Sequence, residues 1–326
     1  MRNLDLDWWR PILALCAALV AAAAACAPGE AARSTSEESV GARGVVSVGM
    51  HASANPGSVN AFWVETHRGV VVIDGLRAIS DAQQALAKIE ALGKPIHAIF
   101  LTHPHPDHYG GIGVFAEAAP GAPIYASRTT RDVIASDILG YSQSANSQLG
   151  DDFPDRPTVP THIAEDGDRF EIDGVTFTTT EVGASEAVSA TVVGVPHARL
   201  AFVGDVISDH VTPALIEGNS LAWLGQLHLA DTRFGRLRTI YVGHGRPGAP
   251  GQLIAQQREY LETFRRLVDE HREPNGAIGD EATARVVAAM NARYPDYPPV
   301  AILPGLLEIN THVIARELAS LAALVE

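Results

Sequence analysis

Four side chains that commonly bind metals lie within six residues of one another: His103, His105, Asp107 and His108. Histidine makes up only 13 of the 326 residues, and a solvated loop has no packing reason to gather three of them beside an aspartate. Neutral imidazoles and a carboxylate suit zinc or a similar divalent ion. The two prolines between them stiffen the segment, so the ligands are held in place before a metal arrives. The pattern therefore predicts a metal centre.

The ligand segment directly follows a predicted buried strand, residues 96–102. Short β-rich runs precede it at 45–50, 59–65 and 70–74, with a helix that starts at the capping-box pattern of Ser80 and ends at Gly93. Helices are expected at 112–118 and 129–139, around a short strand at 123–126. Residues 140–162 contain little periodicity and three prolines, so we expect a long loop that covers a binding site.

Strand patterns return in the second half at 169–172, 175–182, 190–195, 200–203 and 239–242. Asp173-Gly174 is a strong hairpin signal between the first two of these strands. Beyond residue 251 the pattern becomes helical, at 252–271, 280–292 and 304–325. We expect two strand-rich halves, each followed by helices, and a helical extension packed on them.

The ligand segment resembles the HxHxDH motif of the metallo-β-lactamase superfamily, and the resemblance extends from about residue 44 to 248. Two later ligands of that family have counterparts here: Asp205 in Val-Gly-Asp and His244 in Gly-His-Gly. The resemblance implies an α/β (α+β) fold, a four-layered αββα sandwich with the metals at one edge of its sheets. It places the catalytic domain at 44–250 and the helical extension at 251–326.

This sequence departs from the family at the third histidine ligand. Counting back from Asp205, that position falls on Glu186, and no histidine lies between His162 and His197. A glutamate can bind zinc beside two histidines, so we expect Glu186 to be a ligand. A site with one metal, or a rearranged site, is the alternative.

The family's layout implies one ion on His103, His105 and Glu186, and a second on Asp107, His108 and His244, with Asp205 bridging them. Two divalent ions, three carboxylates and a hydroxide sum to zero charge, where a third histidine would leave +1. A less positive pair acidifies water less, and the added oxygen ligand makes manganese or iron more competitive with zinc.

Further roles follow from the same resemblance. Asp107 is expected to orient the nucleophile or to pass a proton to the leaving group. Asp74, at the end of a predicted strand, matches a family aspartate that lies behind the metal loop and supports its ligands.

The chain carries 24 basic and 38 acidic residues, a net charge of −14. Such a charge disfavours binding to nucleic acid or to an anionic membrane surface. The resemblance implies a metal-dependent hydrolase with two zinc ions that directs a metal-activated hydroxide at a lactone, β-lactam or other ester. The alternatives are a mononuclear iron dioxygenase of the same fold and a metal-free binding protein with a decayed site.

Residues 11–25 form an apolar run of signal-peptide length that ends at Ala24-Ala25-Cys26. It resembles a bacterial lipoprotein signal, which predicts removal of residues 1–25, lipid attachment at Cys26 and a flexible tether over 26–43. A plain secretory signal and an uncleaved anchor are the alternatives. Each of them exports the protein, to the periplasm or to the membrane.

Overall fold

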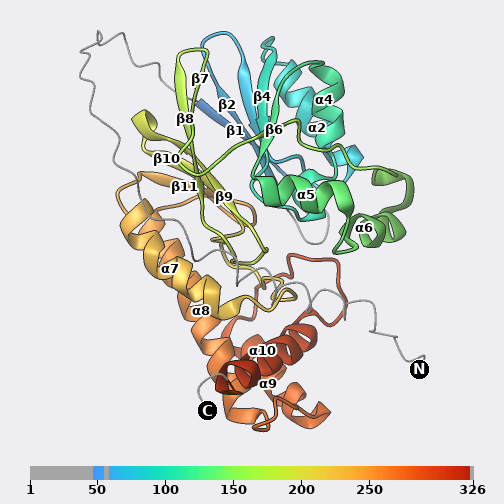
Figure 1. The fold of residues 1–326 in the computed structure, drawn as a ribbon, viewed down its shortest axis with the longest axis vertical. Helices are drawn as coiled ribbons and strands as arrows, with labels where there is room; N and C mark the ends of the chain where they lie inside the picture. Colours follow the sequence, from blue (N-terminus) through green and yellow to red (C-terminus); the bar gives the residue numbers. More distant parts are fainter. Residues whose placement is uncertain (1–46, 55–58, 324–326) are drawn as a thin grey trace.

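The computed structural model describes residues 47–54 and 59–323, which form two β-sheets with helices on their outer faces (Figure 1). The first sheet has the strand order β1-β2-β3-β4-β5-β6, antiparallel from β1 to β3 and parallel from β3 to β6. Its strands are β1 (Ser47–Ala52), β2 (Asn60–Glu65), β3 (Val70–Ile73), β4 (Ile96–Phe100), β5 (Ile124–Ala126) and β6 (His162–Ile163).

The second sheet has the order β11-β10-β9-β8-β7, and only β10 and β11 in it run parallel. Its strands are β7 (Arg169–Ile172), β8 (Val175–Glu181), β9 (Thr191–Val195), β10 (Leu200–Gly204) and β11 (Thr239–Val242). Asp173 and Gly174 both have positive φ, as a two-residue hairpin requires.

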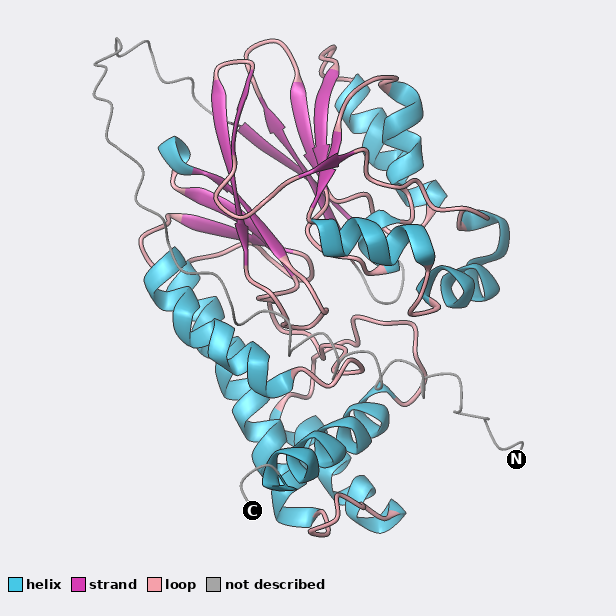
Figure 2. Cartoon of the chain, in the orientation of Figure 1, coloured by secondary structure: helices cyan, strands magenta, loops and turns pink. Residues whose placement is uncertain are grey.

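The helices lie mainly outside the sheets (Figure 2). In the first half they are α2 (Ile79–Glu90), α3 (Pro106–Tyr109), α4 (Ile112–Ala118), α5 (Arg128–Ser136), α6 (Tyr141–Leu149) and the 3-10 turn η3 (Gly150–Asp152). In the second half they are the 3-10 turn η4 (Pro196–Ala198), α7 (Ser220–Phe234), α8 (Pro250–His271), α9 (Asp280–Arg293) and α10 (Leu306–Ala323).

Three layers of apolar side chains hold the four layers of structure together. Between the sheets, Phe62, Phe100 and Phe202 pack with valines of both sheets. A second cluster joins the first sheet to α2 and α4, and the third joins the second sheet to α7, α8 and the C-terminal helices. Because both faces of each sheet are covered, strands such as β3, with the sequence Val-Val-Val-Ile, are apolar throughout.

The expected αββα sandwich with a C-terminal helical part is confirmed, whereas two local predictions need correction and one helix was not predicted. Residues 140–162 are not one long loop, because α6, η3 and the start of β6 lie within them. Ser80 does not cap α2; its backbone N–H and hydroxyl both bond to Asp152, at 2.8 and 2.7 Å. Helix α7 lies in a segment for which the sequence patterns predicted no element.

The predicted signal peptide, its lipidated Cys26 and the tether lie outside the described residues. Within the described ranges, no helix is both long and apolar enough to span a membrane.

Candidate metal centre

All seven predicted ligands lie where strands of the two sheets end. His103 follows β4, Asp205 follows β10 and His244 follows β11, while Glu186 lies in the connection between β8 and β9. The parallel pairs β3–β4 and β10–β11 bring their carboxyl ends to the same edge. Every one of the seven side chains is buried there. The fold thus gathers residues up to 141 positions apart, from His103 to His244, into one site.

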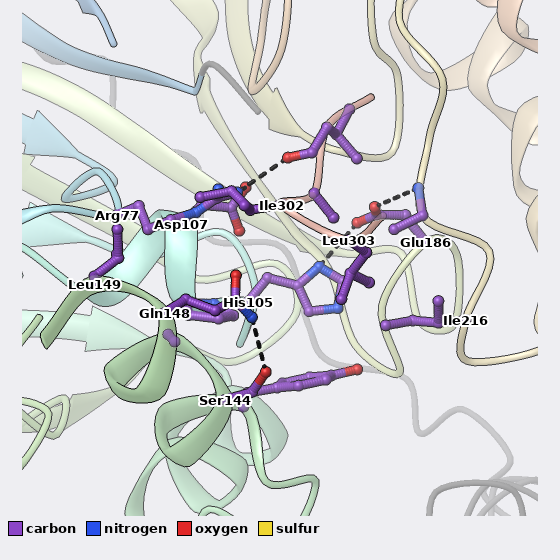
Figure 3. A pocket seen from close by; sticks show the side chains of 16 residues that line it. Arg77, His105, Asp107, Ser144, Gln148, Leu149, Glu186, Ile216, Ile302 and Leu303 are labelled. Atoms are coloured by element: carbon purple, nitrogen blue, oxygen red, sulfur yellow. Dashed lines mark hydrogen bonds and ion pairs between the residues drawn. The ribbon is translucent and has the colours of Figure 1, made fainter. Parts of the chain in front are cut away.

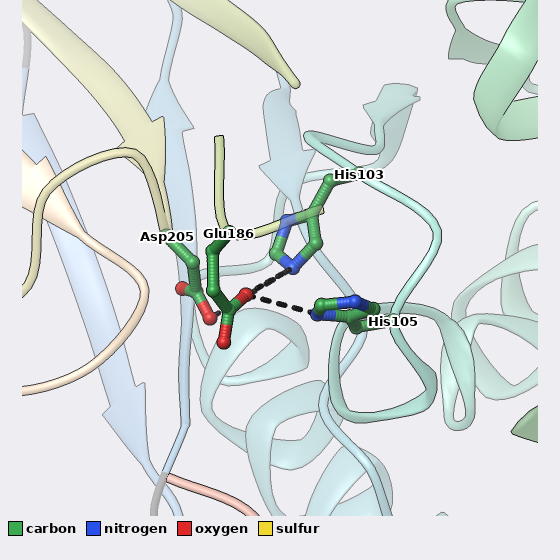
Figure 4. A group of neighbouring side chains, drawn as sticks. All are labelled: His103, His105, Glu186 and Asp205. Carbon is green, nitrogen blue, oxygen red and sulfur yellow. Dashed lines mark ion pairs between the residues drawn. The ribbon is translucent and has the colours of Figure 1, made fainter. Parts of the chain in front are cut away.

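The first group of possible ligands consists of His103, His105, Glu186 and Asp205, whose donor atoms lie within 4.8 Å of one another. In Figure 4 the four side chains point toward a common centre. The Glu186 Oε2 atom lies 2.9 Å from His105 Nδ1 and 3.9 Å from His103 Nε2. Glu186 therefore lies in the same group as the two histidines with which the resemblance pairs it.

The second group consists of Asp107, His108 and His244, again within 4.8 Å of one another. Asp205 contacts both groups: its Oδ1 lies 3.3 Å from His108 Nε2, and its Oδ2 lies 3.1 Å from His244 Nε2 and 3.8 Å from His103 Nε2. A carboxylate in this position can bridge two ions.

Backbone and side-chain contacts fix the ligands from behind. The Asp74 carboxylate accepts hydrogen bonds from Thr102 N and Oγ1, both at 2.8 Å, and its Oδ2 lies 2.9 Å from His108 Nδ1. His108 Nε2 is thereby turned toward the site. At Gly243 a Cβ would collide with Asp205 Oδ1 and approach His108 to 2.7 Å, so a side chain at this position would displace two predicted ligands.

The buried carboxylates of the site create an environment that favours positive charge. Burial raises the pKa of Glu186 to about 7, although His105 opposes this shift. Burial acts to lower the pKa of His244, but Asp205 and Asp107 outweigh it and raise that pKa to about 10. Burial and the neighbouring His108 hold the pKa of His103 well below its usual value, which keeps His103 neutral.

The donor set fits a divalent metal. His103 Nε2, which faces the site, is buried and makes no hydrogen bond with any described residue. Natural proteins rarely leave buried nitrogen and oxygen atoms in this state. Imidazole and carboxylate groups converge here, and a bound ion would give a partner to the nitrogen and oxygen atoms that face the site.

Sequence reasoning missed three side chains of this site. Glu217 lies in the segment just before α7, and its Oε1 atom is 2.9 Å from His105 Nε2. The second missed side chain, Tyr141, donates a hydrogen bond from its hydroxyl to the same Glu217 oxygen. The Nη2 atom of Arg77 lies 3.1 Å from Asp107 Oδ2. None belongs to a motif, and only the fold brings them to the ligands.

A pocket opens beside the centre, with a volume of about 640 Å³ including its mouth. Its lining includes His105, Asp107 and Glu186 together with Ile302 and Leu303 of the C-terminal part, all of which are labelled in Figure 3. Helix α6 lines the pocket as well, so residues 140–162, which were expected to be a loop, contribute a helix to it.

Residues 54–248 match the family model described as the metallo-beta-lactamase superfamily, which is more than half of the chain. The chain belongs to this superfamily. A metallo-beta-lactamase family protein from Thermus thermophilus shares the fold with a TM-score of 0.61 at 17% identity, over 85% of this chain and 94% of that one. A metallo-beta-lactamase from Pontibacter korlensis gives 0.52 at 18% identity, over 69% and 97%.

The similar curated proteins match over shorter stretches. A hydroxyacylglutathione hydrolase from Xylella fastidiosa is 39% identical over 79 residues, 24% of this chain and 31% of its own length. An exodeoxyribonuclease from Streptococcus pneumoniae is 32% identical over 97 residues, 29% of this chain and 36% of its own length. The chain thus spans about a third of these relatives. Superfamily membership and the buried ligand groups indicate a metallo-hydrolase that uses a divalent metal.

Proposed function

We propose that this protein is a hydrolase with two divalent ions, in the first place zinc, that acts on a carbonyl substrate such as a lactone, β-lactam or other ester. The observation that carries the proposal is the pair of buried ligand groups that share Asp205. His103, His105 and Glu186 would hold one ion, and Asp107, His108 and His244 the other. Manganese and iron compete because Glu186 adds a hard oxygen.

Bound ions would lower the pKa of a water molecule and polarise the substrate carbonyl. Asp107 is suited to orient the attacking water through its unprotonated carboxylate. Although burial acts to raise the pKa of its carboxyl, Arg77, His108 and His244 hold that pKa well below its usual range, so the carboxylate is unprotonated at neutral pH. It lines the pocket, where it can orient the attacking water and pass a proton to the leaving group. No serine or cysteine nucleophile is required.

Two side chains support this chemistry without touching the substrate. Asp74 holds His108 through Nδ1, and Glu217 holds His105 through Nε2. In each case the other ring nitrogen faces the ligand groups. Such carboxylates fix the tautomer of the imidazole and strengthen it as a ligand.

We also propose that the protein is exported and held at the membrane by lipid on Cys26, or is periplasmic, with small molecules as substrates and without nucleic-acid partners. The net charge of −14 supports the last point. Labelling with a radioactive fatty acid in cells tests the anchor: incorporation that Cys26→Ser abolishes is expected, and equal incorporation in both would contradict it.

The function is tested by stripping the metal with a chelator, restoring zinc or manganese, and measuring hydrolysis of lactones, β-lactams and nitrophenyl esters. We expect activity that depends on the ion and that Asp107→Ala and His103→Ala abolish. Glu281→Gln, at an exposed position of α9, is the control and should retain full activity. Normal turnover by Asp107→Ala would overturn the proposal, as would a single bound iron with O₂-dependent activity.

A further inference from the structure

We propose that α6 and residues 300–303 form an apolar subsite beside the catalytic centre that binds the linear acyl or alkyl chain of a neutral ester or lactone. This inference rests on the proposed function and names its substrate class. It assigns part of the substrate selection to residues 300–303, which lie beyond the matched residues 54–248.

The pocket lining includes the predicted ligands His105, Asp107 and Glu186. It also includes apolar side chains, among them Ala145, Leu149, Ala214, Ile216, Ile302 and Leu303. Leu149, Ile216, Ile302 and Leu303 remain partly exposed, so apolar surface is available to a bound group. A substrate whose carbonyl reaches the ligands would place its adjoining chain along this surface.

Three sets of contacts hold residues 298–300, which lead into Ile302 and Leu303. Arg77 Nη2 donates to Val300 O at 3.0 Å while also contacting Asp107. Thr212 N donates to Pro298 O at 2.8 Å, and Val300 N donates to Thr212 O at 3.1 Å. Val300 also packs in an apolar cluster with Ala214 and Leu306. These contacts tie residues 298–300 to the centre and hold the start of the segment that carries Ile302 and Leu303.

Charge distinguishes the candidate substrates. Among the described residues that line the pocket, Arg77 is the one arginine or lysine, and it is already engaged by Asp107 and Val300 O. A β-lactam or a glutathione thioester carries a carboxylate of its own. Apart from the metal ions, the pocket lining therefore offers that carboxylate no positive side chain that is not already engaged. A neutral ester or lactone meets no such penalty.

The test compares kcat/KM for nitrophenyl butanoate and octanoate on the zinc-loaded protein. Four additional methylenes should raise kcat/KM on the order of 10- to 200-fold, depending on how completely each is buried. Ile302→Ala and Leu303→Ala should each reduce the octanoate-to-butanoate ratio about fivefold, because they remove apolar contact from the chain. Leu229→Ala, at a 48% exposed position of α7, is the matched control and should leave the ratio unchanged.

A flat response to chain length, or a preference for esters that carry a carboxylate, would overturn the subsite while the hydrolase stands. If no ester is hydrolysed, the proposed function fails, and the subsite is then judged by the binding of a fluorescent octanoyl amide, measured by anisotropy. Saturable binding that Ile302→Asp weakens at least tenfold, with Leu229→Asp unaffected, would support the subsite. Equal binding by both variants would refute it.

Discussion

Replacement of Glu217 tests whether a carboxylate outside the ligand groups sets the metal affinity of the site. Its side chain is fully buried, and its Oε1 lies 2.9 Å from His105 Nε2. Tyr141 OH donates to the same oxygen. When His105 binds an ion through Nδ1, its Nε2 must carry the proton and donate it to a partner. Glu217 is that partner. Its removal therefore weakens His105 as a metal ligand, although Glu217 itself does not bind the ion.

The size of the effect follows from the number of hydrogen bonds lost. A buried hydrogen bond to a charged group contributes about 1.5–3 kcal/mol, and a factor of ten in affinity corresponds to about 1.4 kcal/mol. Glu217→Ala leaves His105 Nε2 without its acceptor and should weaken metal binding roughly 10- to 100-fold, the range typical of such residues. Glu217→Gln retains one acceptor oxygen and should lose less, and Tyr141→Phe should have the smallest effect.

The assay is competition for zinc with a fluorescent chelator, carried out on each folded variant. Circular dichroism and thermal unfolding of the metal-free proteins serve as folding controls. The predicted order of zinc affinity is wild type, Tyr141→Phe, Glu217→Gln, Glu217→Ala, from tightest to weakest. Folded Glu217→Ala that binds zinc within twofold of the wild type would refute a positioning role for this carboxylate.

Three further predictions address the ligands themselves. Glu186→His should retain or raise zinc occupancy and lower that of manganese, because an imidazole replaces a hard oxygen ligand; loss of all metal from the folded variant, by elemental analysis, would show that residue 186 is misassigned. Gly243→Ala should reduce metal content and activity severely, since its Cβ would displace Asp205, and wild-type metal content would contradict the close approach. The metal-free protein should lose stability as pH rises from 6.5 toward 10, because the raised pKa of His244, about 10, stabilises the fold only while that ring is protonated. Metal binding displaces such protons, so the difference in unfolding midpoint between metal-loaded and metal-free protein should widen from pH 6.5 to 8.5; a constant difference would count against protonated ligands in the free site.

The sequence predicted those parts of the site that local pattern encodes. Three histidines and an aspartate in one short segment point to metal without any fold, and the resemblance then located Asp205, His244 and Glu186. The structure brings all seven predicted ligands together. Strands such as β3 and the Asp173-Gly174 hairpin were predictable because apolar runs and positive-φ turn residues act locally.

The remaining features depend on tertiary contacts. The Ser80 hydroxyl could cap its own helix, but Asp152 of a distant segment binds it instead. Helix α6 is rich in serine and polar residues, so its sequence lacks the apolar stripe that identifies a helix. Glu217 and Arg77 are single charged residues without a motif, and they become part of the site only when folding brings His105 and Asp107 beside them.

Elemental mass spectrometry of the purified protein counts the ions that the two ligand groups hold. After reconstitution with zinc or manganese at neutral pH, we expect about two ions per chain, and one or fewer for His244→Ala. A folded wild-type protein that takes up no divalent ion, or a single one that His244→Ala leaves in place, would contradict the dinuclear centre.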